Sequence, residues 1–245
     1  MCGRFTQAYT WTEIHAFLDV IGPARNLRAR YNIAPTTTID VVRPSFSKSD
    51  TSDFLSDTGR ELVRMRWGLA PSWWKKTLKE LPSTFNARAE SVAEKSMFRS
   101  AFKSRRCVIP ASGYYEWTGK SGAKTPHYFS STFGEPLLFA GLWESWRDPE
   151  QDRKIESATI IVGPANEFLA GFHDRAPVMI ARDDVDAWMT GEDPCSLLRP
   201  APPGAVQEWV VSPRVNRTGV GDDDPSLIEA VIAVKTSSSQ GAQPR

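Results

Sequence analysis

The sequence predicts a single α+β domain, built mainly of antiparallel strands and edged by helices. Length, strand spacing and helical periodicity support this fold class. The chain has 245 residues, which suits one large domain with a substantial core. Short β-branched and aromatic runs recur along it, joined by turn-rich pieces too short for parallel crossovers. Segments with helical spacing of apolar residues lie before and between these runs.

The first helix is predicted near the N-terminus. Thr10 and Glu13 have the spacing of a capping box, and Gly22 and Pro23 close the segment. Between them, apolar residues recur at helical intervals: Ile14, Phe17, Leu18 and Ile21.

Two strands and a loop follow this helix. The β-branched run at 38–42 predicts a strand, and the polar composition of 44–60 predicts a solvated loop of variable length. Apolar and basic residues alternate over 62–67, as in a half-exposed strand, and Gly68 with Pro71 then turns the chain.

Residues 85–106 carry polar and basic groups in two patterns. If 85–90 is extended, Asn86, Arg88 and Glu90 share one face. From 93 to 106 the pattern becomes helical and holds the densest basic patch of the chain. Either a nucleic-acid contact or an ordinary solvated helix face fits this patch.

The second half of the chain predicts further strands and two short helices. We expect one domain over 1–234 and a disordered tail over 235–245, which is rich in Ser, Gln, Gly and Pro. The helices are predicted at 164–169 and 183–189, with a loop at 171–177 between them. The strands are predicted at 107–109, 113–117, 127–130, 137–143, 158–162 and 178–180, and the last ordered parts at 209–211 and 212–216.

Composition and motifs exclude several classes of protein. The net charge of +1 gives no overall attraction to nucleic acid or membranes, so binding of a polyanion would need a local patch. No apolar run could span a bilayer or serve as a secretory signal. We expect a monomer without membrane partners, located in the cytoplasm with the nucleoid, or in the nucleus of a eukaryote. The sequence lacks Walker, Rossmann, G-x-S-x-G and H-E-x-x-H motifs.

The cysteines predict neither disulfides nor a metal site. Cys2, Cys107 and Cys195 lie far apart, without a CxxC pair or Cys/His spacing for zinc. Cys107 lies in an apolar run and Cys195 in a predicted turn, so structural or incidental roles suit both. We expect no metal and no small-molecule cofactor.

Cys2 has unusual chemistry if Met1 is removed, as is normal before a small residue. An N-terminal cysteine carries an α-amine and a thiol on adjacent carbons, so an aldehyde can form an imine and then close to a thiazolidine. The amine titrates at roughly 7.7 to 8.0 and the thiol at about 8.5 in model peptides, so both are usable near neutral pH. The alternative is that this cysteine is an accident of composition.

Other residues fit either chemistry or structure. Glu116 lies among aromatic residues in a predicted strand, where burial would raise its pKa, unless its face is exposed. His173 lies in a loop and suits a group that reaches into a cleft, whereas His127 lies in a predicted strand and is assigned a structural role. Trp73 and Trp74 precede two lysines and fit a core plug or a base-stacking surface.

Six segments together, in this order, resemble the SOS-response-associated peptidase (SRAP) family, also called abasic site processing proteins. Each is short, but their joint order is specific, and 44–60 and 235–245 lie outside the match. The resemblance implies a barrel-like β core. The segments are Met1-Cys2-Gly3-Arg4-Phe5, Tyr31-Asn32-Ile33-Ala34-Pro35, Trp67-Gly68-Leu69-Ala70-Pro71-Ser72-Trp73-Trp74, Asn86-Ala87-Arg88-Ala89-Glu90, Gly113-Tyr114-Tyr115-Glu116-Trp117 and His173-Asp174-Arg175-Ala176-Pro177.

The resemblance implies covalent capture of abasic sites in single-stranded DNA, which protects the site during the DNA damage response. An abasic sugar exposes an open-chain aldehyde, the electrophile that the Cys2 aminothiol needs. By analogy, Glu116 moves protons, His173 assists it, and Asn86 holds the N-terminus and sugar oxygens. The implied DNA-binding residues are Arg4, Arg88 and Arg175 for phosphates, with Pro35, Trp73, Trp74 and Met97 in the DNA channel.

Alternative functions remain open at this point. Cys2, Glu116 and His173 also fit a cysteine peptidase or N-terminal nucleophile hydrolase that removes Met1 from itself. A non-covalent binder of single-stranded DNA would use the basic segment and the tryptophans. Lyase-like strand cleavage or reversal from the imine is a further possibility.

Overall fold

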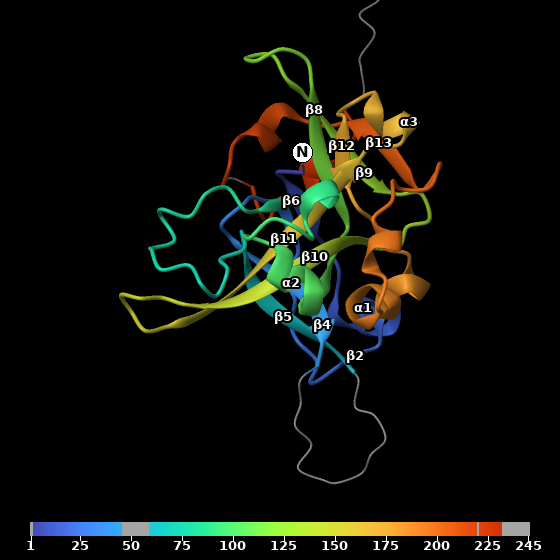
Figure 1. Ribbon diagram of the computed structural model, residues 1–245. Helices are drawn as coiled ribbons and strands as arrows, with labels where there is room; N and C mark the ends of the chain where they lie inside the picture. Colours follow the sequence, from blue (N-terminus) through green and yellow to red (C-terminus); the bar gives the residue numbers. More distant parts are fainter. Residues whose placement is uncertain (1, 46–58, 220, 232–245) are drawn as a thin grey trace, which may run out of the picture.

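Two β-sheets form the body of the protein (Figure 1). The computed structural model describes residues 2–45, 59–219 and 221–231. One sheet has the order β13-β9-β8-β1-β3; the other has the order β12-β11-β10-β7-β4-β5-β2, with β6 paired to β11. The strands are β1 (Phe5–Gln7), β2 (Val20–Ile21), β3 (Arg30–Ile33), β4 (Thr38–Pro44), β5 (Arg60–Trp67), β6 (Asn86–Arg88), β7 (Arg106–Ala111), β8 (Gly113–Thr118), β9 (Thr125–Ser131), β10 (Leu137–Arg147), β11 (Lys154–Pro164), β12 (Arg175–Pro177) and β13 (Val206–Val210).

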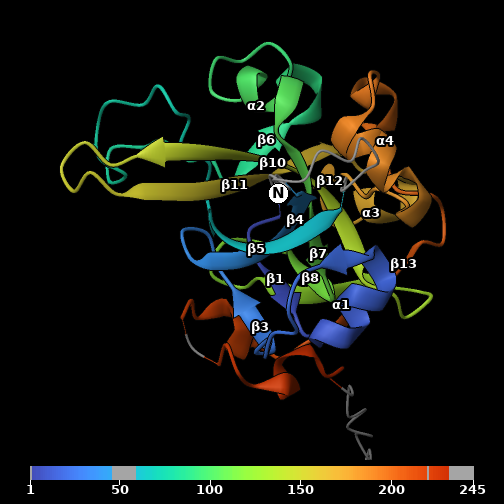
Figure 2. The same cartoon turned by 90° about the horizontal axis from the view of Figure 1, so that it is seen from below.

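The larger sheet closes on itself. β11 pairs with β10, and the ladder continues through β7 and β4 to β5, which pairs back to β11. Most pairings are antiparallel; β11 with β5, β11 with β6 and β2 with β5 are parallel. The ends of β10 and β11 project from the body as a long hairpin (Figure 2). The predicted α+β fold with a mainly antiparallel, barrel-like core is confirmed.

Short helices lie at the edges of the sheets. No helix in the described part of the chain is long and apolar enough to cross a membrane. The α-helices are α1 (Trp11–Leu18), α2 (Arg99–Ser104), α3 (Glu167–Ala170) and α4 (Val185–Thr190). The 3-10 helices are η1 (Ala89–Ser91), η2 (Arg182–Asp184), η3 (Pro194–Leu197), η4 (Pro213–Asn216) and η5 (Pro225–Ile228).

The helix predicted over 93–106 is wrong in extent, because α2 is shorter and Arg106 opens β7. The Arg106 side chain is buried, and its guanidinium donates hydrogen bonds to the carbonyl oxygens of Phe102 and Gly191. These carbonyls lie near the C-terminal ends of α2 and α4, where orphan acceptors need partners. Arg106 therefore satisfies helix ends inside the protein and is not part of a solvated helix face.

Two strand predictions also need correction. β6 ends at Arg88, so Glu90 lies in η1 and does not share an extended face with Asn86. Residues 178–180 do not form a strand but only an isolated bridge at Met179. Their backbone forms hydrogen bonds to β11 at one position and to β10 at others, so no continuous ladder with one strand results. The strand in this region is β12, which lies inside the loop predicted at 171–177 and pairs with the end of β11.

Two predicted segments fall on positions that the structure does not describe. β4 ends at Pro44 and β5 begins at Arg60, and most of the loop predicted over 44–60 lies between them, outside the described residues. The tail predicted over 235–245 also lies outside them.

The capping box of α1 is present and provides a test of local stability. The Thr10 hydroxyl accepts a hydrogen bond from the Glu13 amide at 3.2 Å, and the Glu13 carboxylate accepts one from the Thr10 amide at 2.6 Å. We expect Thr10→Ala to lower the free energy of unfolding by about 1 kcal/mol in urea denaturation. Thr12→Ala, inside the same helix and exposed, is the control. Equal effects of both substitutions would contradict the capping role.

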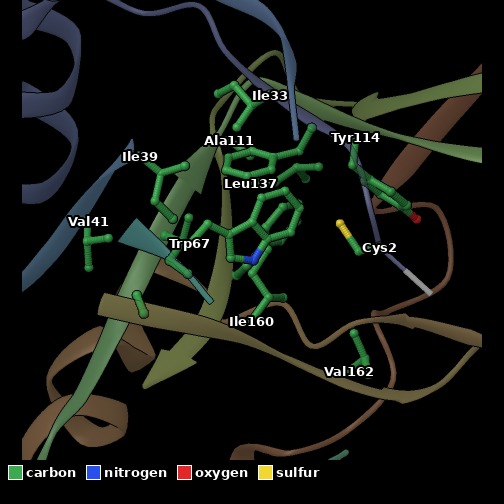
Figure 3. Close-up of a cluster of buried hydrophobic side chains, with 14 of the residues drawn as sticks. Cys2, Ile33, Ile39, Val41, Trp67, Ala111, Tyr114, Leu137, Ile160 and Val162 are labelled. Atoms are coloured by element: carbon green, nitrogen blue, oxygen red, sulfur yellow. The ribbon is translucent and has the colours of Figure 1, made fainter. Parts of the chain in front are cut away.

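The core that supports the N-terminus is built around Trp67. Its ring is completely buried and meets Phe5 edge-on with 4.9 Å between ring centroids. Its indole nitrogen donates a hydrogen bond to the Phe85 carbonyl at 2.9 Å. Cys2 belongs to the same cluster, and Figure 3 shows its thiol beside Tyr114. The core therefore positions both the N-terminal segment and the residue that precedes Asn86.

Candidate functional site

Cys2 lies three residues before the first residue of β1, inside the protein. Its side chain is 0% exposed, and its carbonyl oxygen accepts a hydrogen bond from Asn86 Nδ2 at 2.7 Å. The strand that follows, β1, pairs with β8 in an antiparallel ladder in which Phe5 is opposite Tyr114. Cys2 is thus bonded to β6 directly, while the segment after it is held by β8.

The surroundings of Cys2 keep its thiol protonated. Burial raises the pKa of Cys2 to about 12, and the negative charge of Glu116 adds to this shift. A hydrogen bond from the Arg4 backbone amide opposes it in part. Because only a thiolate attacks efficiently, the Cys2 thiol needs a nearby base at the moment of reaction.

Glu116 is the acidic residue whose charge acts on this thiol. It lies in β8 and is only 8% exposed, so its face of the strand is buried and not solvated. In the antiparallel pairing of β8 and β9 it stands directly opposite His127. Residues paired in this way project from the same face of a sheet. The structure therefore brings together Cys2, Asn86 and Glu116.

His127 is also built into this region, although sequence reasoning assigned it only a structural role. Its Nδ1 lies 2.5 Å from Glu208 Oε1, and its Nε2 lies 2.8 Å from Thr118 Oγ1. These contacts hold the ring beside Glu116. The sequence carries no signal of this arrangement, because the register of β8 with β9 and of β9 with β13 creates it.

His173 follows α3 and is half-buried. Two groups lie within hydrogen-bond distance of its Nδ1. When Nδ1 carries no proton, it accepts a hydrogen bond from the Arg175 backbone amide at 3.0 Å. When Nδ1 is protonated, it can pair with Asp174 Oδ1 at 2.6 Å. The preceding Phe172 packs edge-on against His127, with 5.0 Å between ring centroids. This contact attaches the His173 loop to the sheet that carries Glu116.

One of the two polar side-chain atoms of Asn86 has no hydrogen-bond partner among the described residues. Its Nδ2 donates to the Cys2 carbonyl, while its Oδ1 is buried and has no hydrogen-bond partner among the described residues. A buried acceptor without a partner is costly, so such an atom points to a ligand that can donate a hydrogen bond. A freed α-amine of Cys2 or a sugar hydroxyl group is such a donor.

Arg4 is engaged inside the protein. Its side chain is buried, and its guanidinium donates hydrogen bonds to Asn32 Oδ1, the Val215 carbonyl and Thr218 Oγ1 at 2.5, 2.9 and 2.9 Å. It also lies over the ring of Trp117. Arg4 thereby ties the N-terminal strand to the C-terminal part of the chain, and its contact with a phosphate stays a prediction.

The two other predicted phosphate-binding arginines differ in their surroundings. Arg88 is exposed at the end of β6. Arg175 at the start of β12 forms an ion pair with both oxygens of the Glu90 carboxylate, at 2.5 and 2.7 Å. Arg88 is thus exposed to solvent, whereas Arg175 shares its guanidinium with Glu90, and phosphate binding by either stays a prediction.

Trp73 and Trp74 do not fill the hydrophobic core. Trp73 is 45% exposed, and Trp74 is partly buried with its backbone carbonyl accepting a hydrogen bond from the Trp146 indole at 2.7 Å. This bond attaches the tryptophan loop to the β10–β11 hairpin. Pro35 is half-buried at the edge of a pocket, while Met97 packs against the cluster of hydrophobic residues that includes Phe98.

The three cysteines differ in accessibility, and this difference can be measured. Cys2 and Cys107 are buried, whereas Cys195 is exposed, and burial raises the pKa of Cys107 far above its usual range. We expect one thiol to react quickly with an aromatic disulfide reagent in the native protein, and three after denaturation. Cys195→Ser should remove the fast reaction. A fast reaction that persists in this variant would contradict the burial of the other two.

A barrel-like α+β fold with a buried cysteine at its second residue, bonded through its carbonyl to an asparagine and subject to the charge of a buried glutamate, defines a protein with a buried cysteine site. No group of His, Cys, Asp and Glu within the described ranges could hold a metal ion. The chain belongs to the SOS response associated peptidase (SRAP) family, whose family model matches residues 1–218.

Relatives agree with this membership, and a solved structure shares the fold. The chain is 33% identical over 224 residues to the abasic site processing protein YoaM of Bacillus subtilis, covering 88% of this chain and 93% of that protein. It is 28% identical over 198 residues to the abasic site processing protein YedK of Escherichia coli, covering 78% and 81%. A crystal structure of a protein from Bacteroides thetaiotaomicron has the same fold, with a TM-score of 0.79, 20% identity and coverage of 94% and 100%.

Proposed function

We propose that this protein processes abasic sites in DNA by capturing them covalently through Cys2 after removal of Met1. The names of its relatives support abasic-site processing. The observation that carries the covalent mechanism is the position of Cys2, buried beside Glu116 with its carbonyl held by Asn86. An aminothiol so placed can react with the aldehyde of an open abasic sugar.

The proposed reaction joins the two nucleophiles of Cys2 to one carbon. The α-amine adds to C1 of the sugar, and loss of water gives the imine. The thiol then forms the Sγ–C1 bond, and its proton is delivered to the imine nitrogen. The products are a thiazolidine crosslink and one water molecule. No oxidant or reductant is consumed.

Glu116 is the proposed proton carrier in this sequence. A buried thiol with a raised pKa needs a base to remove its proton, and the Glu116 carboxylate is the charge that already acts on Cys2. The buried Oδ1 of Asn86 accepts a hydrogen bond from the α-amine or the sugar. His173 assists from the loop that Phe172 anchors.

The same geometry argues against a simple cysteine peptidase. Such enzymes activate the nucleophile by lowering the pKa of the thiol, whereas burial and Glu116 raise the pKa of Cys2. An aminothiol mechanism tolerates a protonated thiol, because the amine reacts first. Strand cleavage from the imine competes with ring closure and would appear as a shortened DNA product.

We further propose that the captured DNA is single-stranded. Trp73 offers an exposed aromatic face and Arg88 an exposed charge, the combination that binds unpaired bases and phosphates without sequence preference. Binding should weaken steeply with salt, because phosphate contacts release counterions.

The test mixes purified protein, with loss of Met1 confirmed by intact mass, and a single-stranded oligonucleotide that carries one abasic site. Denaturing electrophoresis and mass analysis should show a heat-stable adduct whose mass equals protein plus DNA minus one water. Blocking the α-amine by retaining Met1 should abolish it. Binding without any adduct would overturn the covalent mechanism and favour a non-covalent DNA-binding protein.

A further inference from the structure

A pocket of about 540 Å³ lies beside the buried cluster that contains Cys2. Its walls come from residues 35–36, 66–68, 78–79 and 81–85. The last two segments belong to the loop that follows Trp73 and Trp74. The volume falls within the range of about 300 to 1,000 Å³ that is typical of sites for small organic groups.

Two residues place this pocket close to Cys2. Trp67 lines the pocket and belongs to the same buried cluster as Cys2. On another wall, Phe85 directly precedes Asn86, which donates to the Cys2 carbonyl. The pocket therefore borders the buried cluster that contains Cys2 on one side and the strand that holds the Cys2 carbonyl on the other.

The walls combine apolar surface with positive charge. Pro35, Leu78 and Phe85 contribute flat or apolar surface. Lys79 is exposed at the rim, and Arg66 is half-buried with its guanidinium donating to the Gly68 carbonyl at 2.6 Å. Apolar walls with cations at the rim suit an unpaired base whose phosphate stays near solvent.

Thr84 adds an independent sign of a ligand. It lines the pocket and is 4% exposed, and its Oγ1 is buried without a hydrogen-bond partner among the described residues. A buried hydroxyl group normally has a partner. Because a hydroxyl group both donates and accepts, it can bond to the edge of any of the four bases.

We propose that this pocket receives the unpaired base of a nucleotide adjoining the abasic sugar. The inference rests on the proposed function, because DNA must lie at Cys2, but it assigns a separate subsite. Pro35, Leu78 and Phe85 contact the base, Thr84 bonds to its edge, and Lys79 and Arg66 neutralise its phosphate. Filling this subsite withdraws the adjacent base from the strand and orients the sugar toward Cys2.

The test measures affinity, so that it does not depend on crosslinking. Fluorescence anisotropy would follow binding to single-stranded oligonucleotides with a stable tetrahydrofuran analogue at the abasic position. In two further oligonucleotides, the base on the 5′ or the 3′ side is also removed, with all phosphates kept. For one of the two sides we expect an affinity about tenfold lower.

Ser83→Trp fills the pocket from an exposed position on its wall and provides the protein-side test. It should lower affinity for the intact oligonucleotide about tenfold and abolish the effect of removing the base. Thr84→Val should reduce that effect without changing the fold. Ser121→Trp, in the exposed turn between β8 and β9, should behave as wild type.

Two results separate this inference from the proposed function. If wild type binds all three oligonucleotides equally, or if Ser83→Trp stays as sensitive to base removal as wild type, the base pocket is wrong. Adduct formation with a true abasic site would still stand. If the base effect is present but no adduct forms, the pocket is supported and the covalent mechanism fails.

Discussion

Cys2→Ala is expected to abolish the heat-stable adduct between this protein and an abasic oligonucleotide. The variant keeps an N-terminal α-amine after removal of Met1 but has no thiol to close the ring. Its imine hydrolyses on heating, so denaturing electrophoresis should show free DNA. Reduction with borohydride before heating should trap that imine and restore a shifted band.

Matched variants separate the chemistry of Cys2 from its packing. Cys2 is completely buried, so thermal denaturation must show that Cys2→Ala folds as wild type does. Cys2→Ser keeps a small polar side chain and should also lose the heat-stable product. Cys195→Ser removes an exposed thiol and should crosslink normally. A heat-stable adduct in Cys2→Ala would show that another group captures the DNA.

Glu116→Gln should slow adduct formation by about 10²- to 10⁴-fold, the usual contribution of a positioned acid or base. The substitution keeps the size of the side chain and removes its charge. Time courses at fixed excess of protein, sampled by denaturing electrophoresis, measure the rate. Glu167→Gln, an exposed acid in α3, is the control and should leave the rate unchanged.

The sign of this effect distinguishes two roles for Glu116. Its charge helps to raise the pKa of Cys2, so removing the charge lowers that pKa and makes the thiolate easier to form. If Glu116 acted only through this field, the variant would react faster at neutral pH. A slower reaction therefore identifies proton transfer, whereas an unchanged or faster rate would refute it.

Much of the fold could be predicted because its signals are local. The capping box at Thr10 and Glu13 specifies the start of α1 through contacts three residues apart. The alternation before Trp67 marks β5 in the same way. By contrast, the C-terminal part of the basic segment was misread, because Arg106 is buried against carbonyls at the ends of α2 and α4. No local pattern shows that a charged residue has such distant partners.

The residue types of the candidate site were identified from the sequence, since short motifs carry Cys2, Asn86, Glu116 and His173. The environment of these residues could not be identified from the sequence. The burial of Glu116 was left open, and the roles of His127 and of the pocket lined by Thr84 were missed.

By itself, then, the sequence determined the reactive groups of this protein: an aminothiol at Cys2, a carboxylate at Glu116 and an amide at Asn86. Only the tertiary structure decided which of these groups meet and how their protons are held. Strands from separate parts of the chain bring Asn86 to the Cys2 carbonyl and place Glu116 where its charge acts on the thiol. The pKa of Cys2 depends on burial and on a charge more than a hundred residues away in the sequence, because electrostatic interactions follow distance in space and not along the chain.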